Sequence, residues 1–249
     1  FHNFWGGFVP SKSFLARALG DSFDLSFDAA GRDLQISSVF GSQQLPRPPT
    51  GRPLRVWFSG EARDPVAQFY DLYFAFRASH TMLGRRWHRF PLWVTYIDWW
   101  QPDTPRSLDR LIAPRSATPR PRFCNFIYTN PVSIRAEFFL TLDALRRVDS
   151  FGAILNNTGQ RPRGLDGKMQ VLEQSQFTIA FENQIAPGYV TEKLVEPLIA
   201  GSIPIYWGDE QAKSDFNPAA FIFANDDGSI DDLARHVLRV ADSADAVAT

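Results

Sequence analysis

The chain has 249 residues and a mass of 28.2 kDa, enough for one large domain or two small ones. Hydrophobic residues make up 44% and charged residues 21%, a globular composition that excludes a disordered or fibrous chain. The 26 basic and 27 acidic residues leave a net charge of −1, which excludes a global basic excess for holding nucleic acid. We therefore expect no nucleic-acid partner, and we expect any anion site to be local.

The cysteine content and the hydropathy bear on the compartment. Cys124 is the only cysteine, so the sequence indicates neither an internal disulfide nor a cysteine-rich zinc site. No stretch of about 18 apolar residues is present, and residues 1–10 do not resemble a signal peptide. We expect a cytoplasmic protein. The chain does not begin with Met, so we expect that it could be a segment of a longer protein, cut at either end.

The first half of the chain has three apolar runs, for which we predict strands. They are Leu54–Ser59, Asp71–Phe76 and Pro91–Ile97. The stretch Gln101–Arg122 holds five prolines and five arginines in 22 positions, which is typical of a loop or linker. We place a domain boundary at its end, giving an N-terminal domain over residues 1–122 and a C-terminal domain over residues 123–249.

The second half begins with a β-prone run, Phe123–Tyr128, followed by Thr129-Asn130-Pro131, which offers caps and a proline suited to a helix start. Apolar residues then recur at spacings of four, four and three, which predicts one face of a helix. These residues are Ile134, Phe138, Leu142 and Leu145. A loop rich in Gly, Asn and Arg is predicted from Asn156 to Gly167.

Strands and helices alternate from there to the end of the chain. We predict strands over Phe177–Phe181 and Ile203–Trp207, and helices over Val190–Ala200 and Ile230–Val240. Gly201 is placed to close the first of these helices, and Ser229 with Asp232 resembles a capping box before the second. This alternation indicates an α/β fold with a parallel sheet.

The segment between residues 182 and 193 is the best candidate for chemistry. A strand ends at Glu182-Asn183, a loop follows, and a helix then begins near Lys193. In open parallel sheets ligands bind beyond the carboxyl ends of the strands, and a helix N-terminus there suits a phosphate. A cation near a helix N-terminus is mildly unfavourable, so Lys193 indicates a nearby anion. The alternative is a solvated Lys193 paired with a neighbour such as Glu196.

Residues 177–221 resemble the signature of the α-1,3-fucosyltransferases, inverting enzymes that use GDP-fucose. The matching segments are Phe181-Glu182-Asn183, Tyr189-Val190-Thr191-Glu192-Lys193, Ala200-Gly201, Ile203-Pro204-Ile205-Tyr206-Trp207-Gly208, Asp215-Phe216-Asn217-Pro218 and Phe221. Weaker matches upstream are Val56–Glu61, Phe90-Pro91-Leu92, Phe123-Cys124-Asn125-Phe126 and Arg135-Ala136-Glu137-Phe138-Phe139. The resemblance implies a GT-B architecture, two Rossmann-like domains facing a cleft, with the acceptor on the first domain and the nucleotide sugar on the second.

The resemblance also implies roles for individual residues. Glu61 would be the base that deprotonates the acceptor hydroxyl, and the alternative is an ordinary exposed loop carboxylate. Arg135 and Lys193 would neutralise the departing diphosphate. The alternative for Arg135 is a surface side chain paired with Glu137 or Asp143.

The remaining site residues follow from the same resemblance. Glu192 would accept hydrogen bonds from the ribose hydroxyls, and Asn183 and Tyr189 would line the same pocket. Glu182 would either contact fucose or order the loop. The chain has no Asp-x-Asp motif, so we expect neither an obligatory metal nor another obligatory cofactor.

These roles predict an inverting glycosyltransferase that moves fucose from GDP-fucose to a GlcNAc hydroxyl in α-1,3 linkage. The implied acceptor is an N-acetyllactosamine-like oligosaccharide, often on bacterial lipopolysaccharide. Two alternatives stay open: a related GT-B enzyme with another nucleotide sugar, and a catalytically silent module that binds a nucleotide or a glycan. Family members usually run longer, with a C-terminal helical segment that crosses back to the first domain.

Overall fold

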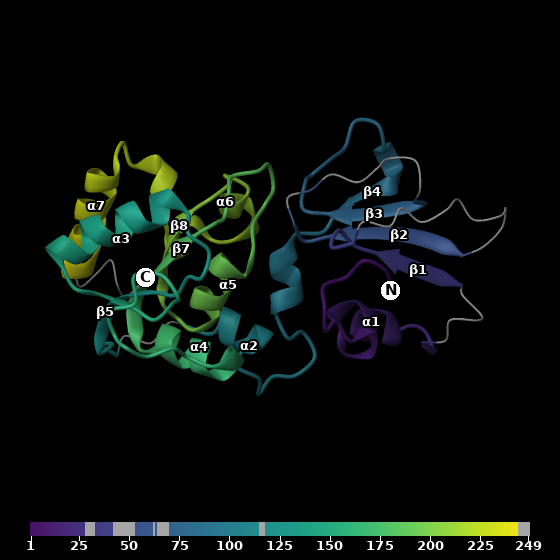
Figure 1. The fold of residues 1–249 in the computed structure, drawn as a ribbon, viewed down its shortest axis with the longest axis horizontal. Helices are drawn as coiled ribbons and strands as arrows, with labels where there is room; N and C mark the ends of the chain where they lie inside the picture. Colours follow the sequence, from purple (N-terminus) through teal and green to yellow (C-terminus); the bar gives the residue numbers. More distant parts are fainter. Residues whose placement is uncertain (28–32, 42–52, 62, 64–69, 115–117, 244–249) are drawn as a thin grey trace. The chain divides into compact units, whose positions relative to one another are not determined.

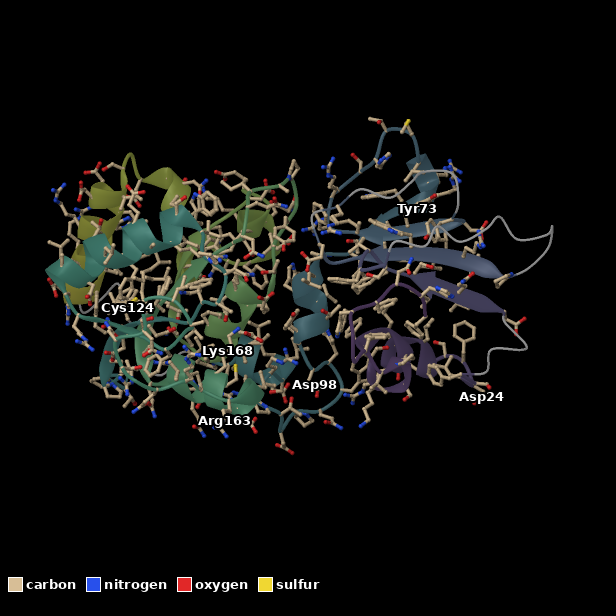
Figure 2. All side chains as sticks on the ribbon, viewed as in Figure 1. Asp24, Tyr73, Asp98, Cys124, Arg163 and Lys168 are labelled. Atoms are coloured by element: carbon tan, nitrogen blue, oxygen red, sulfur yellow. The ribbon has the colours of Figure 1, made fainter. Side chains whose placement is uncertain are left out.

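The computed structural model describes residues 1–27, 33–41, 53–61, 63, 70–114 and 118–243 (Figure 1). The chain divides into two compact units, Phe1–Thr95 and Tyr96–Thr249. Each unit is built on a parallel sheet, with the side chains of Tyr73 and Cys124 among those buried in the first and second unit (Figure 2). None of the helices in these ranges combines the length and the hydropathy that crossing a bilayer demands.

The sheet of the first unit has the order β1-β2-β3-β4, and all its neighbouring strands run parallel. The strands are β1 (Leu34–Ser37), β2 (Leu54–Ser59), β3 (Leu72–Ala75) and β4 (Trp87–Arg89). The remaining elements are η1 (Pro10–Lys12), α1 (Phe14–Gly20) and η2 (Gly84–Arg86). β2 matches its predicted range, and β3 lies within the predicted Asp71–Phe76. The core combines aliphatic residues with stacked aromatic rings, such as Phe4 against Phe58.

The predicted strand Pro91–Ile97 is wrong, because Leu92–Tyr96 forms the 3₁₀ helix η3. The Val94 N–H donates to the Pro91 carbonyl at 3.2 Å, and the Thr95 hydroxyl donates to the Leu92 carbonyl at 2.9 Å. A short apolar run does not by itself distinguish a strand from a helical turn, and local hydrogen bonds decided the matter here.

The sheet of the second unit has the order β6-β5-β7-β8-β9, again with all neighbours parallel, which confirms the parallel α/β prediction. The strands are β5 (Arg122–Phe126), β6 (Val148–Ser150), β7 (Ser175–Phe181), β8 (Ile203–Trp207) and β9 (Ile222–Phe223). The helices are α2 (Leu108–Ile112), α3 (Ser133–Leu145), α4 (Gly164–Glu173), α5 (Glu192–Ile199), α6 (Ala212–Asp215), η4 (Pro218–Ala220), η5 (Ala224–Asp226) and α7 (Ile230–Asp242).

Caps and glycines set several of these boundaries. The Ser229 hydroxyl accepts the Asp232 N–H at 3.1 Å and begins α7, as predicted. Gly201 has φ +69° and follows α5, a conformation that favours glycine, as predicted. The predicted loop Asn156–Gly167 is partly wrong, because α4 begins at Gly164.

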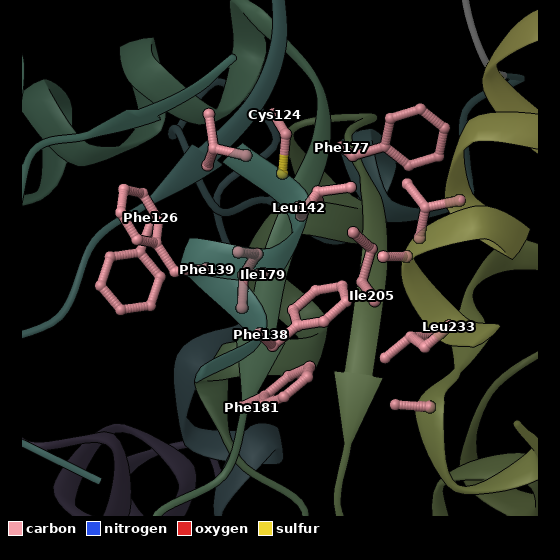
Figure 3. Close-up of a cluster of buried hydrophobic side chains, with 14 of the residues drawn as sticks. Cys124, Phe126, Phe138, Phe139, Leu142, Phe177, Ile179, Phe181, Ile205 and Leu233 are labelled. Atoms are coloured by element: carbon pink, nitrogen blue, oxygen red, sulfur yellow. The ribbon is translucent and has the colours of Figure 1, made fainter. Parts of the chain in front are cut away.

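Helices α3 and α7 pack on one face of this sheet (Figure 3). Strand residues Phe177, Ile179 and Phe181 point to that face, because side chains in a strand alternate. Phe138 and Leu142 of α3 are fully buried against them, as the helical spacing predicted. The same spacing predicts Leu145 on this face, but that prediction is wrong, because Leu145 is 54% exposed.

The segment predicted as a linker is fastened to the second unit. It contains α2, and the Arg106 guanidinium lies 3.3 Å from the Glu196 carboxylate on α5. The Arg120 guanidinium donates to the carbonyls of Leu172, Glu173 and Ala200, at the ends of α4 and α5. Arg120 therefore satisfies helix-end carbonyls and Arg106 pairs with a helix carboxylate, uses that composition does not reveal. The compact units divide at Thr95 and Tyr96, whereas we predicted a boundary after residue 122.

Candidate active site

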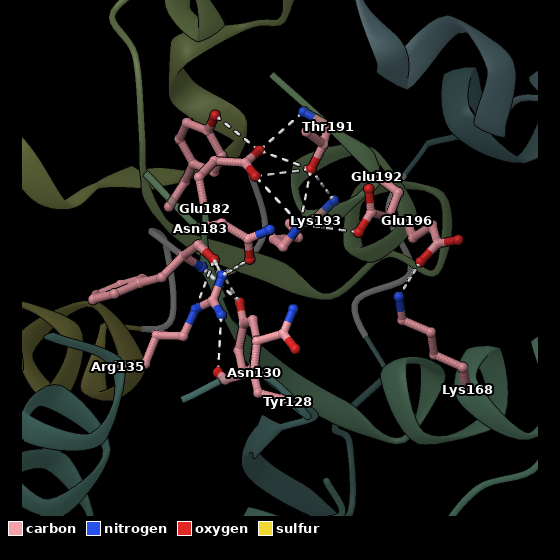
Figure 4. A network of polar contacts seen from close by, with 12 residues as sticks. Tyr128, Asn130, Arg135, Lys168, Glu182, Asn183, Thr191, Glu192, Lys193 and Glu196 are labelled. Atoms are coloured by element: carbon pink, nitrogen blue, oxygen red, sulfur yellow. Dashed lines mark hydrogen bonds and ion pairs between the residues drawn. The ribbon is translucent and has the colours of Figure 1, made fainter. Parts of the chain in front are cut away.

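Polar side chains of the second unit gather where β7 ends and α5 begins (Figure 4). The end of β8 lies next to them, since the Phe181 and Trp207 positions are paired in the sheet. The carboxyl ends of neighbouring parallel strands therefore meet the N-terminus of a helix here, the arrangement in which open α/β sheets bind ligands.

The Glu182 carboxylate lies at the centre of this cluster and is fully buried. Its Oε1 accepts the Thr191 N–H at 2.9 Å, and both of its oxygens lie 2.9 Å from the Thr191 hydroxyl. The Tyr206 hydroxyl also donates to Oε1, at 3.3 Å. Burial raises the pKa of Glu182, although the nearby Lys193 ammonium opposes that rise. Glu182 therefore ties β7 to both β8 and the start of α5.

The Lys193 ammonium lies between two carboxylates. Its Nζ is 3.0 Å from the Glu192 carboxylate and 3.4 Å from that of Glu182, and 14% of the side chain is exposed. Burial lowers the pKa of Lys193, but the two carboxylates outweigh burial and raise it overall. The alternative pairing with Glu196 is wrong, because the Glu196 carboxylate pairs with Arg106 and Lys168.

Arg135 is fully buried, so a surface pairing with Glu137 or Asp143 is excluded. Its Nε and Nη2 donate to the Phe181 carbonyl at 3.1 and 2.7 Å, and Nη2 also donates to Asn183 Oδ1 at 2.8 Å. Its Nη1 donates to the Asn130 carbonyl at 3.3 Å. Most of the guanidinium N–H groups are thus used to hold the end of β7.

Tyr128 supports Arg135 and is a residue that the sequence did not single out. The Arg135 guanidinium carbon lies 4.1 Å from the centre of the Tyr128 ring. The Tyr128 hydroxyl accepts the Phe181 N–H at 2.7 Å, and it lies 3.0 Å from the Ile179 carbonyl, to which it can donate. Nothing in the local sequence marks this tyrosine, because its hydrogen-bond partners Ile179 and Phe181 lie 51 and 53 positions away.

The other predicted donor-site residues differ in exposure. Asn183 is exposed, and Glu192 has 20% of its side chain exposed beside Lys193. Tyr189 is 3% exposed, so its side chain packs inside the unit. Burial raises the pKa of Glu192, but the Lys193 and Lys168 ammonium groups outweigh burial and lower it overall.

Asp209 holds the loop between Asn183 and α5. Its Oδ1 accepts the Gly188 N–H at 2.7 Å and the Gln211 N–H at 3.1 Å. Gly188 has φ +80°, in the left-handed region that favours glycine. The sequence did not identify Asp209 as part of the site, and only its position just after the predicted strand Ile203–Trp207 could have indicated it.

Glu61 lies in the first unit, two residues after β2, and is half-buried. Its N–H donates to the Ser59 hydroxyl at 3.1 Å, and its carbonyl accepts from the same hydroxyl at 2.8 Å. The predicted placement after a buried strand is confirmed. Its role as a base, and its position opposite Arg135 and Lys193 during the reaction, stay predictions.

The described residues contain no group of three or more His, Cys, Asp or Glu side chains that could hold a metal ion. The positive groups at the β7–α5 end are side chains of the chain itself. The expectation that no metal is obligatory stays a prediction.

Two family models match the chain. The model for the α-(1,3)-fucosyltransferase FucT N-terminal domain matches residues 1–96. The C-terminal model of glycosyltransferase family 10 (fucosyltransferase) matches residues 123–248. The segment between the two matches corresponds closely to the part of the second unit that precedes β5.

Similar proteins agree with these matches. The α-(1,3)-fucosyltransferase FucT of Helicobacter pylori is 33% identical over 116 residues, covering 46% of this chain and 24% of that protein. The 4-galactosyl-N-acetylglucosaminide 3-α-L-fucosyltransferase of Pan troglodytes is 26% identical over 208 residues, covering 79% of this chain and 53% of that protein. The matched parts thus span about a quarter and about half of these relatives.

The fold also resembles that of solved fucosyltransferase structures. A crystal structure of an α1,3-fucosyltransferase with GDP-fucose superposes with a TM-score of 0.76 at 23% identity, covering 99% of this chain and 78% of that one. The predicted GT-B class, with two α/β units on parallel sheets, is confirmed. Because one family model covers half of the sequence and another covers the first unit, the chain belongs to glycosyltransferase family 10, the fucosyltransferases.

Proposed function

We propose that the protein transfers fucose from GDP-fucose to a hydroxyl of a glycan acceptor, forming an α-1,3 linkage with inversion. The observation that carries the proposal is the Lys193 ammonium, which is held in charged form at the start of α5 with part of its side chain exposed. A largely buried cation that keeps some exposed surface at the carboxyl edge of a parallel sheet suits a diphosphate leaving group.

The second unit would bind the donor. Lys193 would neutralise the charge that grows on the diphosphate as the bond to fucose breaks. Glu192, partly exposed beside Lys193, would accept hydrogen bonds from the ribose hydroxyls. Asn183 would present its amide to the same ligand, because its side-chain oxygen is already held by Arg135.

Arg135 would contribute in two ways. Its positive charge lies close to the proposed diphosphate position, because it bonds to Asn183 and to the last residue of β7. A direct phosphate contact would require Arg135 to exchange one of its present bonds, of which the 3.3 Å bond to the Asn130 carbonyl is the longest. Tyr189, buried behind the loop, would support the pocket rather than form hydrogen bonds to the sugar.

Glu61 would act as the base. A carboxylate that removes the proton of the attacking hydroxyl as the C–O bond forms lets the oxygen attack from the face opposite GDP. The half-buried position of Glu61 after a rigid strand suits this task, since the backbone is fixed by two hydrogen bonds to Ser59. The first unit would also hold the acceptor.

The acceptor that we favour carries GlcNAc, as in N-acetyllactosamine. The printed name of the Pan troglodytes relative, a 4-galactosyl-N-acetylglucosaminide fucosyltransferase, supports this choice. We extend the proposal to lipopolysaccharide-linked glycans, with the enzyme in the cytoplasm and peripheral at the inner membrane. We also propose that no metal is needed.

Mass spectrometry tests the proposal directly. The protein is incubated with GDP-fucose and a panel of Gal-GlcNAc disaccharides, and the products are mapped by fragmentation. We expect one fucose on the 3-hydroxyl of GlcNAc. A thermal-shift series with GDP-fucose, GDP-mannose and UDP-sugars tests the enzyme with another nucleotide sugar. Binding of GDP-fucose without transfer to any acceptor would favour the silent binding module.

A further inference from the structure

We propose that Glu182 and Tyr206 form a positioning pair that sets the Lys193 ammonium and the start of α5 for the donor diphosphate, without touching the donor. This inference rests on the proposed function and assigns to Tyr206 a part in the reaction. It also decides between the two roles considered for Glu182, because the carboxylate orders the site and does not bind fucose.

The first argument is accessibility. The Glu182 residue has no exposed surface, so no ligand atom reaches its carboxylate in this structure. Tyr206 is also fully buried. Lys193 and Glu192, in contrast, keep 14% and 20% of their side chains exposed. The charged groups of the cluster therefore differ in exposure, because Glu182 is sealed from solvent whereas Lys193 and Glu192 can meet a ligand. Figure 4 shows the contacts among these side chains.

The second argument is the number of elements that Glu182 joins. Its backbone N–H donates to the Trp207 carbonyl at 2.9 Å, which fixes the position of the residue against β8. Its carboxylate accepts from the Thr191 N–H and hydroxyl and from the Tyr206 hydroxyl. Thr191 is the N-cap of α5, so Glu182 sets where that helix begins.

The third argument is the link to Lys193. The ammonium lies 3.4 Å from the Glu182 carboxylate and 3.3 Å from the Thr191 hydroxyl, which itself donates to Glu182. Two contacts of the ammonium thus come from the bonded pair Glu182 and Thr191, and the third comes from Glu192. Preorganised charge is worth more than mobile charge in stabilising a leaving group, because no reorganisation is needed during the reaction.

α5 offers a matched control. Glu196 is another buried carboxylate on this helix, 2% exposed, with cationic partners of its own in Arg106 and Lys168. It does not pair with Lys193. The Glu196→Gln variant therefore reports what the loss of a buried carboxylate on α5 does by itself.

The test measures GDP affinity by calorimetry, kcat and KM for GDP-fucose, and acetylation of Lys193 by acetic anhydride in the ligand-free protein. For Glu182→Gln we expect GDP affinity to fall about tenfold, the size of a lost charge-assisted hydrogen bond. We also expect faster Lys193 acetylation. Tyr206→Phe should change GDP affinity and the Lys193 acetylation rate in the same directions but by less. Glu196→Gln should leave GDP affinity and the acetylation rate unchanged.

A double-mutant cycle with Lys193→Met checks that Glu182 acts through Lys193. In the Lys193→Met background, Glu182→Gln should change GDP affinity by less than about twofold, because coupled residues are not additive. Additive effects, or unchanged Lys193 acetylation in folded Glu182→Gln and Tyr206→Phe, would overturn the inference. If the wild-type protein neither binds GDP nor transfers fucose, the proposed function fails, while the acetylation result still decides the role of Glu182.

Discussion

Glu182 in the second unit and Glu61 in the first both follow a buried parallel strand, but their surroundings differ. The Glu182 carboxylate is fully buried and bonded to groups from α5 and β8. Glu61 is half-buried, and among the described residues its hydrogen bonds are made by its backbone. The two proposed roles predict this contrast, because a carboxylate that organises a site is saturated with partners, whereas one that accepts a proton keeps its oxygens available.

The largest effect is expected at the available carboxylate. Glu61→Gln should lower kcat by at least about 100-fold, because the acceptor hydroxyl loses its general base. GDP affinity should stay unchanged, since the proposed donor contacts lie in the second unit. Transfer assays and calorimetry measure the two quantities. Glu137→Gln, at an exposed position of α3, is the control, and near wild-type turnover in Glu61→Gln would contradict the assignment.

The next effect is expected at Lys193. Lys193→Met should weaken GDP binding about 10- to 100-fold, because a charged donor to the diphosphate is lost. Calorimetry with GDP measures the change. Lys213→Met is the matched control, since Lys213 forms its ion pairs with Glu210 and Asp226. Equal affinities in the two variants would remove Lys193 from the donor site.

Arg135 should affect both folding and binding. Arg135→Lys keeps the charge but loses the fork that bonds the Phe181 carbonyl twice, so the free energy of unfolding should fall by about 1–3 kcal/mol. Urea denaturation measures that loss, and calorimetry should record weaker GDP binding. A fully stable variant with unchanged GDP affinity would show that the buried guanidinium has neither role.

A smaller effect concerns pH. Burial raises the pKa of Glu182 above its unfolded value, so the folded state binds this proton more tightly than the unfolded state. The contribution of this group to stability is full below the unfolded pKa, about 4.3, and is lost as the pH rises through the folded pKa. Since Gln resembles the protonated form, Glu182→Gln should be at least as stable as wild type at pH 7. The difference should shrink towards pH 4.

Thermal unfolding between pH 4 and pH 8 measures this difference, with Glu196→Gln as the control. A Glu182→Gln variant that is clearly less stable than wild type at pH 7 would show that the ion pair with Lys193 outweighs the burial of the carboxylate. If Glu182→Gln binds GDP more weakly but is as stable as wild type, Glu182 serves the donor site and not the stability of the fold.

Chelation should have no effect. Activity in EDTA should equal activity without it, because the proposed mechanism neutralises the diphosphate with Lys193 and Arg135. The prediction rests on the absence of an Asp-x-Asp motif. Activity that is lost in EDTA and restored by Mn²⁺ would contradict it.

The sequence by itself determined the α/β class, the parallel sheet of the second unit and the family motif. Hydrophobic runs such as Leu54–Ser59 and Ile203–Trp207 matched strands to the residue, and Gly201 and Ser229 marked helix ends. These signals are local, because periodicity, caps and positive φ depend on a few neighbouring residues.

Only the tertiary structure decided how the site residues are used. The partners of Arg135 at Phe181 and Asn183 lie more than 40 positions away, so neither its burial nor its bonds could be predicted from its own neighbourhood. The same holds for the Tyr128 hydroxyl, which bonds Phe181, and for Arg120, which bonds Ala200. Asp209 reaches Gly188, which lies 21 positions away. A polar side chain is identified by the sequence, but its role depends on which distant donors and acceptors the fold brings within hydrogen-bonding distance.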